Sequence, residues 1–220
     1  MPENLRNTMA AYTDRMDELT PGKSGDYSLR SQSEFSITPT GVSYSEMKPG
    51  DFPILDLNGE LLEGSLDPSS ELPVHRSLYD GLDCSAIVHV HSPWATTLGA
   101  LGESLSYVHY AAALAGPEVP LVEYYTYGSE TLAAAVLEEM QRAATSACFL
   151  ANHGQVVVGD SLEHAFEAAE AVEFTARIEC QARMIGAPNE LSAEEVLEAR
   201  RKFEDYGQEN PSESDDSENN

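Results

Sequence analysis

Two histidines separated by a single residue stand at the end of the segment 86–91, Ala-Ile-Val-His-Val-His. The β-branched residues around them predict a strand, and side chains at i and i+2 of a strand point to the same face. An unpaired imidazole in such an apolar segment would cost roughly 1–3 kcal/mol, so His89 and His91 need a partner. A metal ion is one candidate. A pair of hydrogen-bonded core histidines is the other, and the spacing alone does not choose between them.

A third histidine, His153, falls between two predicted strands at 147–151 and 156–158, and Gly154 behind it permits a tight turn. Three neutral imidazoles with an open or carboxylate-filled fourth position form the arrangement typical of catalytic zinc. His153 follows His91 by 62 positions in the sequence, which leaves open whether the three rings converge.

Glu71 is the candidate carboxylate for the fourth position. It ends the sequence Pro-Ser-Ser-Glu at 68–71, which is typical of a helix start. An acid in the first turn of a helix also interacts favourably with the helix dipole, and this is the competing interpretation of Glu71. His75, His109 and His164 lie in helix-like or junction contexts, where we expect them to pack or to face solvent.

The elements that must position these residues follow from apolar periodicity and turn signals. An N-terminal helix is expected over residues 5–19, ending before Pro21-Gly22. Residues 25–62 are expected to form short strands, with Asn58-Gly59 as a hairpin turn. Later helices are expected from about 71 to 81, 93 to 101 and 162 to 184, with further helices after the capping residues Ser129 and Ser192.

Strand hairpins first, then helices alternating with strands, indicate an α/β fold: a single three-layer α/β/α domain over residues 1–206 with a mixed, mostly antiparallel central sheet. Residues 207–220 contain no large apolar side chain and five acids. With nothing to bury, they are predicted to be a disordered acidic tail.

The charge of the chain is strongly negative: 38 acids against 12 bases give a net charge of -26. Such a field repels nucleic acid and anionic membranes, so neither is an expected partner. A folded, acid-rich protein with only three lysines (Lys23, Lys48 and Lys202) is also typical of a high-salt, halophilic cytoplasm. An ordinary acidic protein is the alternative.

The apolar stretches, the N-terminus and the cysteines predict where in the cell the protein resides. No apolar stretch approaches the roughly 20 residues that a membrane-spanning helix needs, and the N-terminus does not have the pattern of a secretory signal. Cys84, Cys148 and Cys180 are too few and too widely spaced for a disulfide framework or a zinc ribbon. They are expected to be buried apolar residues in a reducing cytoplasm.

Several short motifs, taken in order, resemble the class II aldolase/adducin family, and within it the L-fuculose-phosphate aldolases. They are Pro39-Thr40-Gly41, Pro68-Ser69-Ser70-Glu71, Val88-His89-Val90-His91, His109-Tyr110-Ala111-Ala112-Ala113, Tyr127-Gly128, Asn152-His153-Gly154 and Tyr206-Gly207. The similarity runs from about Leu19 to Tyr206, and several motifs in the same order are more specific than any one of them.

The resemblance implies roles for individual residues. His89, His91 and His153 would hold one zinc ion, or a similar divalent metal, per subunit. Glu71 would ligate the metal at rest and act as general base, Tyr110 would act on the hydroxyl of the aldehyde half, and Tyr206 would reach into a neighbouring subunit's site. The phosphate cradle would comprise Gly25, Asp26, Thr40, Gly41, Ser69 and Ser70.

One position departs from the family pattern, which usually has Gly-Asn where this chain has Gly25-Asp26. A carboxylate beside a phosphate is unfavourable unless it is protonated or turned away. The resemblance further implies a homotetramer, with each active site at a subunit boundary.

The expected activity is therefore a zinc-dependent, reversible aldol cleavage of a ketose 1-phosphate similar to L-fuculose 1-phosphate, giving dihydroxyacetone phosphate and an aldehyde. Three alternatives stay open: a sugar-phosphate 4-epimerase, a methylthioribulose-phosphate dehydratase, and an adducin-like interaction module without catalysis. The retained histidines argue against the module, and Glu71 argues against the epimerases, which typically carry aspartate there.

Overall fold

The computed structural model describes residues 2–20 and 22–204. Its eight strands form one sheet in the order β4-β3-β2-β1-β5-β8-β7-β6. Only β6 and β7 are parallel neighbours; every other described pair is antiparallel. The strands are β1 (Asp26–Ser31), β2 (Glu34–Ile37), β3 (Ile54–Asp56), β4 (Leu61–Glu63), β5 (Ala86–Val90), β6 (Leu121–Val122), β7 (Ala147–Leu150) and β8 (Gly154–Gly159).

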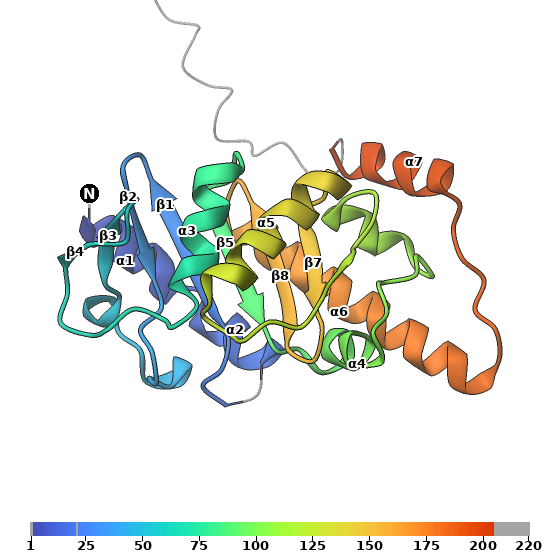
Figure 1. Cartoon of the computed structure of the whole chain (residues 1–220), viewed down its shortest axis with the longest axis horizontal. Helices are drawn as coiled ribbons and strands as arrows, with labels where there is room; N and C mark the ends of the chain where they lie inside the picture. Colours follow the sequence, from blue (N-terminus) through green and yellow to red (C-terminus); the bar gives the residue numbers. More distant parts are fainter. Residues whose placement is uncertain (1, 21, 205–220) are drawn as a thin grey trace, which may run out of the picture.

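Helices cover both faces of this sheet (Figure 1). The α-helices are α1 (Pro2–Ala10), α2 (Thr13–Leu19), α3 (Leu72–Gly81), α4 (Pro93–Leu101), α5 (Glu130–Ala143), α6 (Leu162–Ile185) and α7 (Ala193–Glu204); short 3-10 helices are η1 (Tyr44–Glu46), η2 (Pro49–Asp51) and η3 (Tyr110–Ala115). Helices α3 and α5 pack together over one face, while α4 and α6 pack on the other. The predicted three-layer α/β/α architecture with a mixed, mostly antiparallel sheet is confirmed.

The alternation of side chains along β5 separates the two cores. Ile87 belongs to the cluster that contains Leu78 of α3 and Val136 of α5, whereas Val88 and Val90 pack with the side of α4 and α6. By the two-residue period of a strand, His89 and His91 share the face of Ile87. The site therefore opens on the side of the sheet that α3 and α5 cover.

Several local predictions are confirmed. Asn58-Gly59 connects the antiparallel strands β3 and β4, and Gly59 has the left-handed φ of 87° that such turns favour. Ser129 caps α5 by accepting a hydrogen bond from the Leu132 amide. Before α7, Ser192 and Glu195 form the expected reciprocal capping box.

The N-terminal prediction of one helix over residues 5–19 is wrong, because a turn at Ala11-Tyr12 divides it into α1 and α2. The amides of both turn residues donate to carbonyls three residues back, which tightens the backbone and ends α1. The Tyr12 ring stacks on Phe166 of α6, with ring centroids 5.4 Å apart. The turn lets Met9 and Met16, one from each helix, both reach zero exposure against the same core.

The expectations for the cysteines, for membrane-spanning helices and for the tail remain to be compared with the structure. Cys84 and Cys148 are buried as expected, but Cys180 is only half-buried on α6. None of the described helices combines the length and apolarity that crossing a bilayer demands. The tail predicted to be disordered, residues 207–220, lies outside the described residues.

Candidate active site

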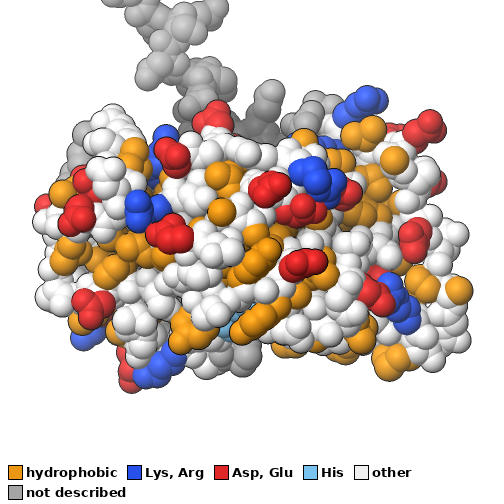
Figure 2. All heavy atoms as spheres, viewed as in Figure 1, with side chains coloured by type: hydrophobic (Ala, Val, Ile, Leu, Met, Phe, Trp, Pro, Cys, Tyr) orange, Lys and Arg blue, Asp and Glu red, His pale blue; other side chains and the backbone are white. Residues whose placement is uncertain are grey.

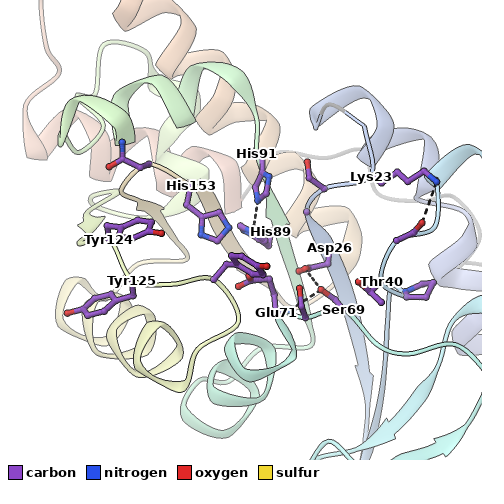
Figure 3. Close-up of a pocket in the computed structure, with 17 residues that line it drawn as sticks. Lys23, Asp26, Thr40, Ser69, Glu71, His89, His91, Tyr124, Tyr125 and His153 are labelled. Carbon is purple, nitrogen blue, oxygen red and sulfur yellow. Dashed lines mark hydrogen bonds between the residues drawn. The ribbon is translucent and has the colours of Figure 1, made fainter.

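The three histidines singled out from the sequence converge. Strand β5 carries His89 and leads directly into His91, and the turn between β7 and β8 provides His153. Their ring centroids lie 4.8–4.9 Å apart, and one ligand nitrogen from each lies within 4.8 Å of the others. Figure 3 shows the three rings turned toward one another.

The β7–β8 turn reaches this position through its backbone. Asn152 adopts a left-handed φ of 58°, and the His153 amide donates to the Leu150 carbonyl. Gly154 follows, and a Cβ at this residue would lie 2.4 Å from the Val90 carbonyl oxygen. Glycine therefore lets the turn press against the end of β5, which closes the gap of 62 residues in sequence.

Hydrogen bonding sets the tautomer of His89. Its Nδ1 lies 2.9 Å from the Gln155 carbonyl oxygen, which can only accept, so Nδ1 carries the proton. Nε2 is then an acceptor and faces Nε2 of His91 at 3.1 Å. A tetrahedral ion with nitrogen bonds of 2.0–2.1 Å separates its ligands by roughly 3.3 Å, so these two nitrogens are already spaced to share one ion.

The protonation of the triad also suits a metal. Burial, and after it the neighbouring imidazoles, lower the pKa of His91 and His153 to about 4. Burial likewise lowers the pKa of His89 to about 4. All three rings are neutral at pH 7 and present lone pairs. This donor set fits a divalent transition metal such as zinc.

Glu71 immediately precedes α3 and is only 6% exposed. Burial, followed by the charge of Asp26, raises the pKa of Glu71 to about 7, although the backbone N–H of Gly128 donates to its carboxylate. Its side chain makes no capping hydrogen bond to the helix; it faces the pocket instead (Figure 3). Among the described residues, the side chains close enough to share a metal ion are the three histidines, and Glu71 is not one of them. The role of Glu71 as a metal ligand therefore remains a prediction.

Asp26 is buried at the start of β1 and turned away from open solvent. One carboxylate oxygen accepts from Ser69 Oγ at 2.5 Å and the other lies 2.7 Å from His75 Nε2. Burial alone would raise the pKa of Asp26, but the charge and hydrogen bond of His75, together with Ser69, outweigh it and lower the pKa to about 2. The departure from the family pattern is thus built into a hydrogen-bond network.

This network continues into the protein. His75 Nδ1 lies 2.6 Å from Ser28 Oγ, which in turn lies 2.7 Å from the Tyr79 hydroxyl. His75 is fully buried. It therefore packs as expected, but its partnership with a pocket carboxylate is an addition. No signal in the sequence pointed to this partnership, because it joins α3 to β1.

The histidines and the acids share one cavity of about 360 Å³. All six residues predicted for the phosphate cradle line it, and so do all four predicted metal residues: Gly25, Asp26, Thr40, Gly41, Ser69, Ser70, Glu71, His89, His91 and His153. An isolated bridge between Pro39 and Pro68 and a hydrogen bond from the Ser69 amide to the Thr38 carbonyl tie the two cradle loops together.

Sequence reasoning did not single out four other lining residues: Lys23, Ser24, Tyr124 and Tyr125. Tyr124 and Tyr127, from the loop after β6, are each more than 60% exposed. They form an aromatic rim on the cavity. Tyr127 belongs to a motif already noted in the sequence, but Lys23 and Tyr124 stand in segments without any such signal.

One predicted catalytic residue, Tyr110, does not reach this cavity within its own chain. Tyr110 begins η3, is 56% exposed and stacks on Phe203 of α7 with centroids 5.9 Å apart. It does not line the described cavity. Tyr206 lies outside the described residues. The catalytic roles of both therefore remain predictions.

Comparison with known proteins agrees with this geometry. The Class II Aldolase and Adducin N-terminal domain matches residues 8–180. A 5-deoxy-D-ribulose 1-phosphate aldolase from Bacillus thuringiensis serovar kurstaki is 41% identical over 208 residues, which is 92% of this chain and 97% of the relative. A 5-methylthioribulose-1-phosphate/5-deoxyribulose-1-phosphate aldolase from Rhodospirillum rubrum is 34% identical over 191 residues, 86% of this chain and 85% of the relative.

A solved structure of an L-fuculose 1-phosphate aldolase superimposes with a TM-score of 0.87 at 35% identity, covering 91% of this chain and 96% of that one. The matches span 85–97% of these relatives, and three histidines of this chain are placed so that they could hold a metal ion. The chain belongs to the class II aldolase and adducin family, and it is an enzyme of that family, a metal-dependent aldehyde-lyase.

Proposed function

We propose that this enzyme cleaves a ketose 1-phosphate of the 5-deoxypentulose type, giving dihydroxyacetone phosphate and a short aldehyde such as acetaldehyde. The observation that carries the proposal is the single cavity that joins three neutral imidazoles, a carboxyl group of raised pKa and a hydroxyl-lined cradle. The relatives at 41% and 34% identity, both named for 5-deoxyribulose 1-phosphate, support the choice of substrate.

The aromatic rim supports the same choice. Tyr124 and Tyr127 line the cavity and are largely exposed, and Figure 3 shows Tyr124 on the His153 side of the cavity. A 5-deoxy sugar ends in a methyl group, and apolar contact with a tyrosine ring suits a methyl better than a hydroxyl that would lose its water. L-fuculose 1-phosphate, the substrate of the solved relative, leaves a more polar aldehyde and is the competing candidate.

The residues of this chain divide the reaction between them. The three imidazoles would hold a divalent ion, which supplies Lewis-acid stabilisation of the charge that develops on the carbonyl oxygen during cleavage. Glu71 delivers a proton to C3 of the dihydroxyacetone half as the C3–C4 bond breaks, and a pKa near 7 lets one carboxyl group serve both reaction directions. The C4 hydroxyl loses its proton in the same reaction, and Tyr110 is the residue predicted to act on that hydroxyl.

That last role requires a second copy of the chain, because Tyr110 lies outside the cavity of its own subunit. We propose a closed homotetramer in which each site is completed at a subunit boundary. The mass of the active enzyme in solution, measured by light scattering, is expected to be four times that of the chain. An active monomer would contradict this assembly.

The experiment that tests the function is release of dihydroxyacetone phosphate and aldehyde from 5-deoxyribulose 1-phosphate and L-fuculose 1-phosphate in parallel. Activity is expected with both and a higher kcat/KM with the first. Chelation should abolish it and added zinc should restore it. Release from neither substrate would contradict the aldolase assignment, and formation of an epimer without aldehyde would indicate an epimerase.

Two histidine variants distinguish an effect on the metal site from the general effect of removing a histidine. His91→Ala is expected to lose bound metal and activity together. His164→Ala removes an exposed imidazole of α6 outside the cavity and is expected to leave both unchanged.

A further inference from the structure

Lys23 lies on the opposite side of the cavity from Tyr124 and Tyr125 (Figure 3). It lies in the loop before β1, and its Nζ donates to the Gly41 carbonyl oxygen over 3.4 Å. Figure 3 shows Lys23 and Thr40 on one side, Tyr124 and Tyr125 on the other, and the histidines between them. The lysine therefore belongs to the end of the cavity that the cradle loops form.

The backbone around Lys23 is built to bring this loop close. Gly25 has a left-handed φ of 76°, and a Cβ there would lie 2.6 Å from the His89 carbonyl oxygen. Only glycine allows this approach of the loop to β5 without displacement of backbone. Lys23 lies two residues earlier, at the edge of the cradle, and its side chain is exposed.

The cavity wall contains two carboxyl groups, so a phosphate group that binds there needs a cationic side chain nearby. Asp26 and Glu71 are both in the wall, and within the part of the chain that the structure describes Lys23 is the only lysine or arginine there. Hydrogen bonds to Ser69 and His75 hold the Asp26 carboxyl group in place in this wall. A phosphate dianion entering this end meets a fixed carboxylate, and hydroxyl and amide donors alone do not balance that charge.

We propose that Lys23 binds the phosphate group of the substrate and sets the preference of this enzyme for phosphorylated over unphosphorylated sugars. The bond to Gly41 is long and joins a charged donor to a neutral carbonyl. A phosphate oxygen is the stronger acceptor for an ammonium group, so Nζ leaves the carbonyl for the ligand. The proposal rests on the proposed function, because it assigns the phosphate end of the same site.

The experiment compares Lys23→Met with Lys48→Met. Both changes remove one positive charge from an exposed lysine and so alter the net charge equally, but Lys48 does not line the cavity. Lys23→Met is expected to raise the KM for the ketose 1-phosphate, and the inhibition constant of inorganic phosphate, by about tenfold, with kcat within about twofold. Lys23→Arg should restore most of the affinity, and Lys48→Met should match the wild type.

A second readout uses the unphosphorylated ketose at high concentration. Its kcat/KM should be the same in wild type and Lys23→Met if the lysine acts on the phosphate alone. Equal KM values for the Lys23 and Lys48 variants would overturn the proposal. So would an equal loss with both sugars. A wild-type enzyme that cleaves neither sugar but still binds inorganic phosphate through Lys23, measured by calorimetry, would instead overturn the proposed function.

Discussion

Two carboxyl groups in the same cavity have pKa values displaced in opposite directions. Asp26 accepts hydrogen bonds from a hydroxyl and an imidazole and has a pKa of about 2. Glu71 is buried with only a backbone N–H as partner, faces the charge of Asp26, and has a pKa of about 7. Residue type alone does not separate these roles. Their neighbours do, and they leave Asp26 as a fixed charge and Glu71 as the group able to exchange a proton near neutral pH.

Glu71→Gln should separate chemistry from stability. We expect kcat to fall by about 10²–10⁴-fold, because the amide cannot transfer the proton, while most of the metal is retained. A carboxyl group whose pKa is raised by folding destabilises the folded state only at pH values above its unfolded pKa. The metal-free variant should therefore be more stable than metal-free wild type at pH 8, by roughly 1–3 kcal/mol, and equal to it near pH 4. Denaturant melts at both values check this, and near-normal turnover would contradict the catalytic role.

Asp26→Asn should show the reverse pH dependence. A carboxyl group whose pKa is lowered by folding contributes stability above its unfolded pKa of about 3.8, and this contribution is lost as the pH falls toward 2. We expect wild type to be more stable than the variant by on the order of 2 kcal/mol at pH 6, with the gap closing below pH 4. A gap that is constant from pH 6 to pH 3 would show that Asp26 is not held as an ion.

At the scale of elements, the sequence predicted what is local. The β-branched run correctly placed His89 and His91 on one face of a strand, and the capping residues before α5 and α7 were found in advance. The convergence of His153 was not predictable, because it depends on β8 pairing with β5 across the sheet. The partnership of His75 with Asp26 was missed for the same reason, since it joins α3 to β1.

Gly154→Ala tests how tightly the β7–β8 turn controls the metal site. The new methyl group would lie 2.4 Å from the Val90 carbonyl oxygen and 3.0 Å from the His91 ring, so backbone must move. We expect a loss of stability of about 1–3 kcal/mol and weaker metal binding, measured by thermal melts and bound metal. Gly50→Ala, where a Cβ meets no atom within 4 Å, is the control and should change neither. Full metal affinity in Gly154→Ala would mean that the turn does not position His153.

At the scale of the whole molecule, charge dominates. Acidic side chains are scattered over the face shown in Figure 2, and the few bases lie among them. The ion pairs of Arg6, Arg15, Arg142, Arg183 and Lys202 engage acids, but 38 acids outnumber 12 bases. Net repulsion should therefore outweigh these surface pairs, each of which contributes about 1 kcal/mol or less.

Salt should stabilise this protein. The screening length falls from roughly 30 Å at 0.01 M to about 3 Å at 1 M, so repulsion between acids is suppressed. We expect Tm and the tetramer fraction to rise between dilute buffer and molar salt, with equal effects of NaCl and KCl. A flat or falling Tm would remove the halophilic interpretation and leave the enzyme assignment unchanged. Contacts between subunits could likewise be predicted only from the family resemblance. Tyr110 illustrates this, because it is exposed in the single chain.

The metal-type histidines are attached to β5 and to the turn leading into β8, two strands that have hydrogen-bonded neighbours on both sides. Amides in such central strands exchange with solvent only when the whole domain opens, whereas exposed loops open far more often. We expect the two strands that carry or adjoin these ligands to open only with the domain as a whole. We therefore expect a bound ion to exchange with solvent through the cavity without unfolding of these strands.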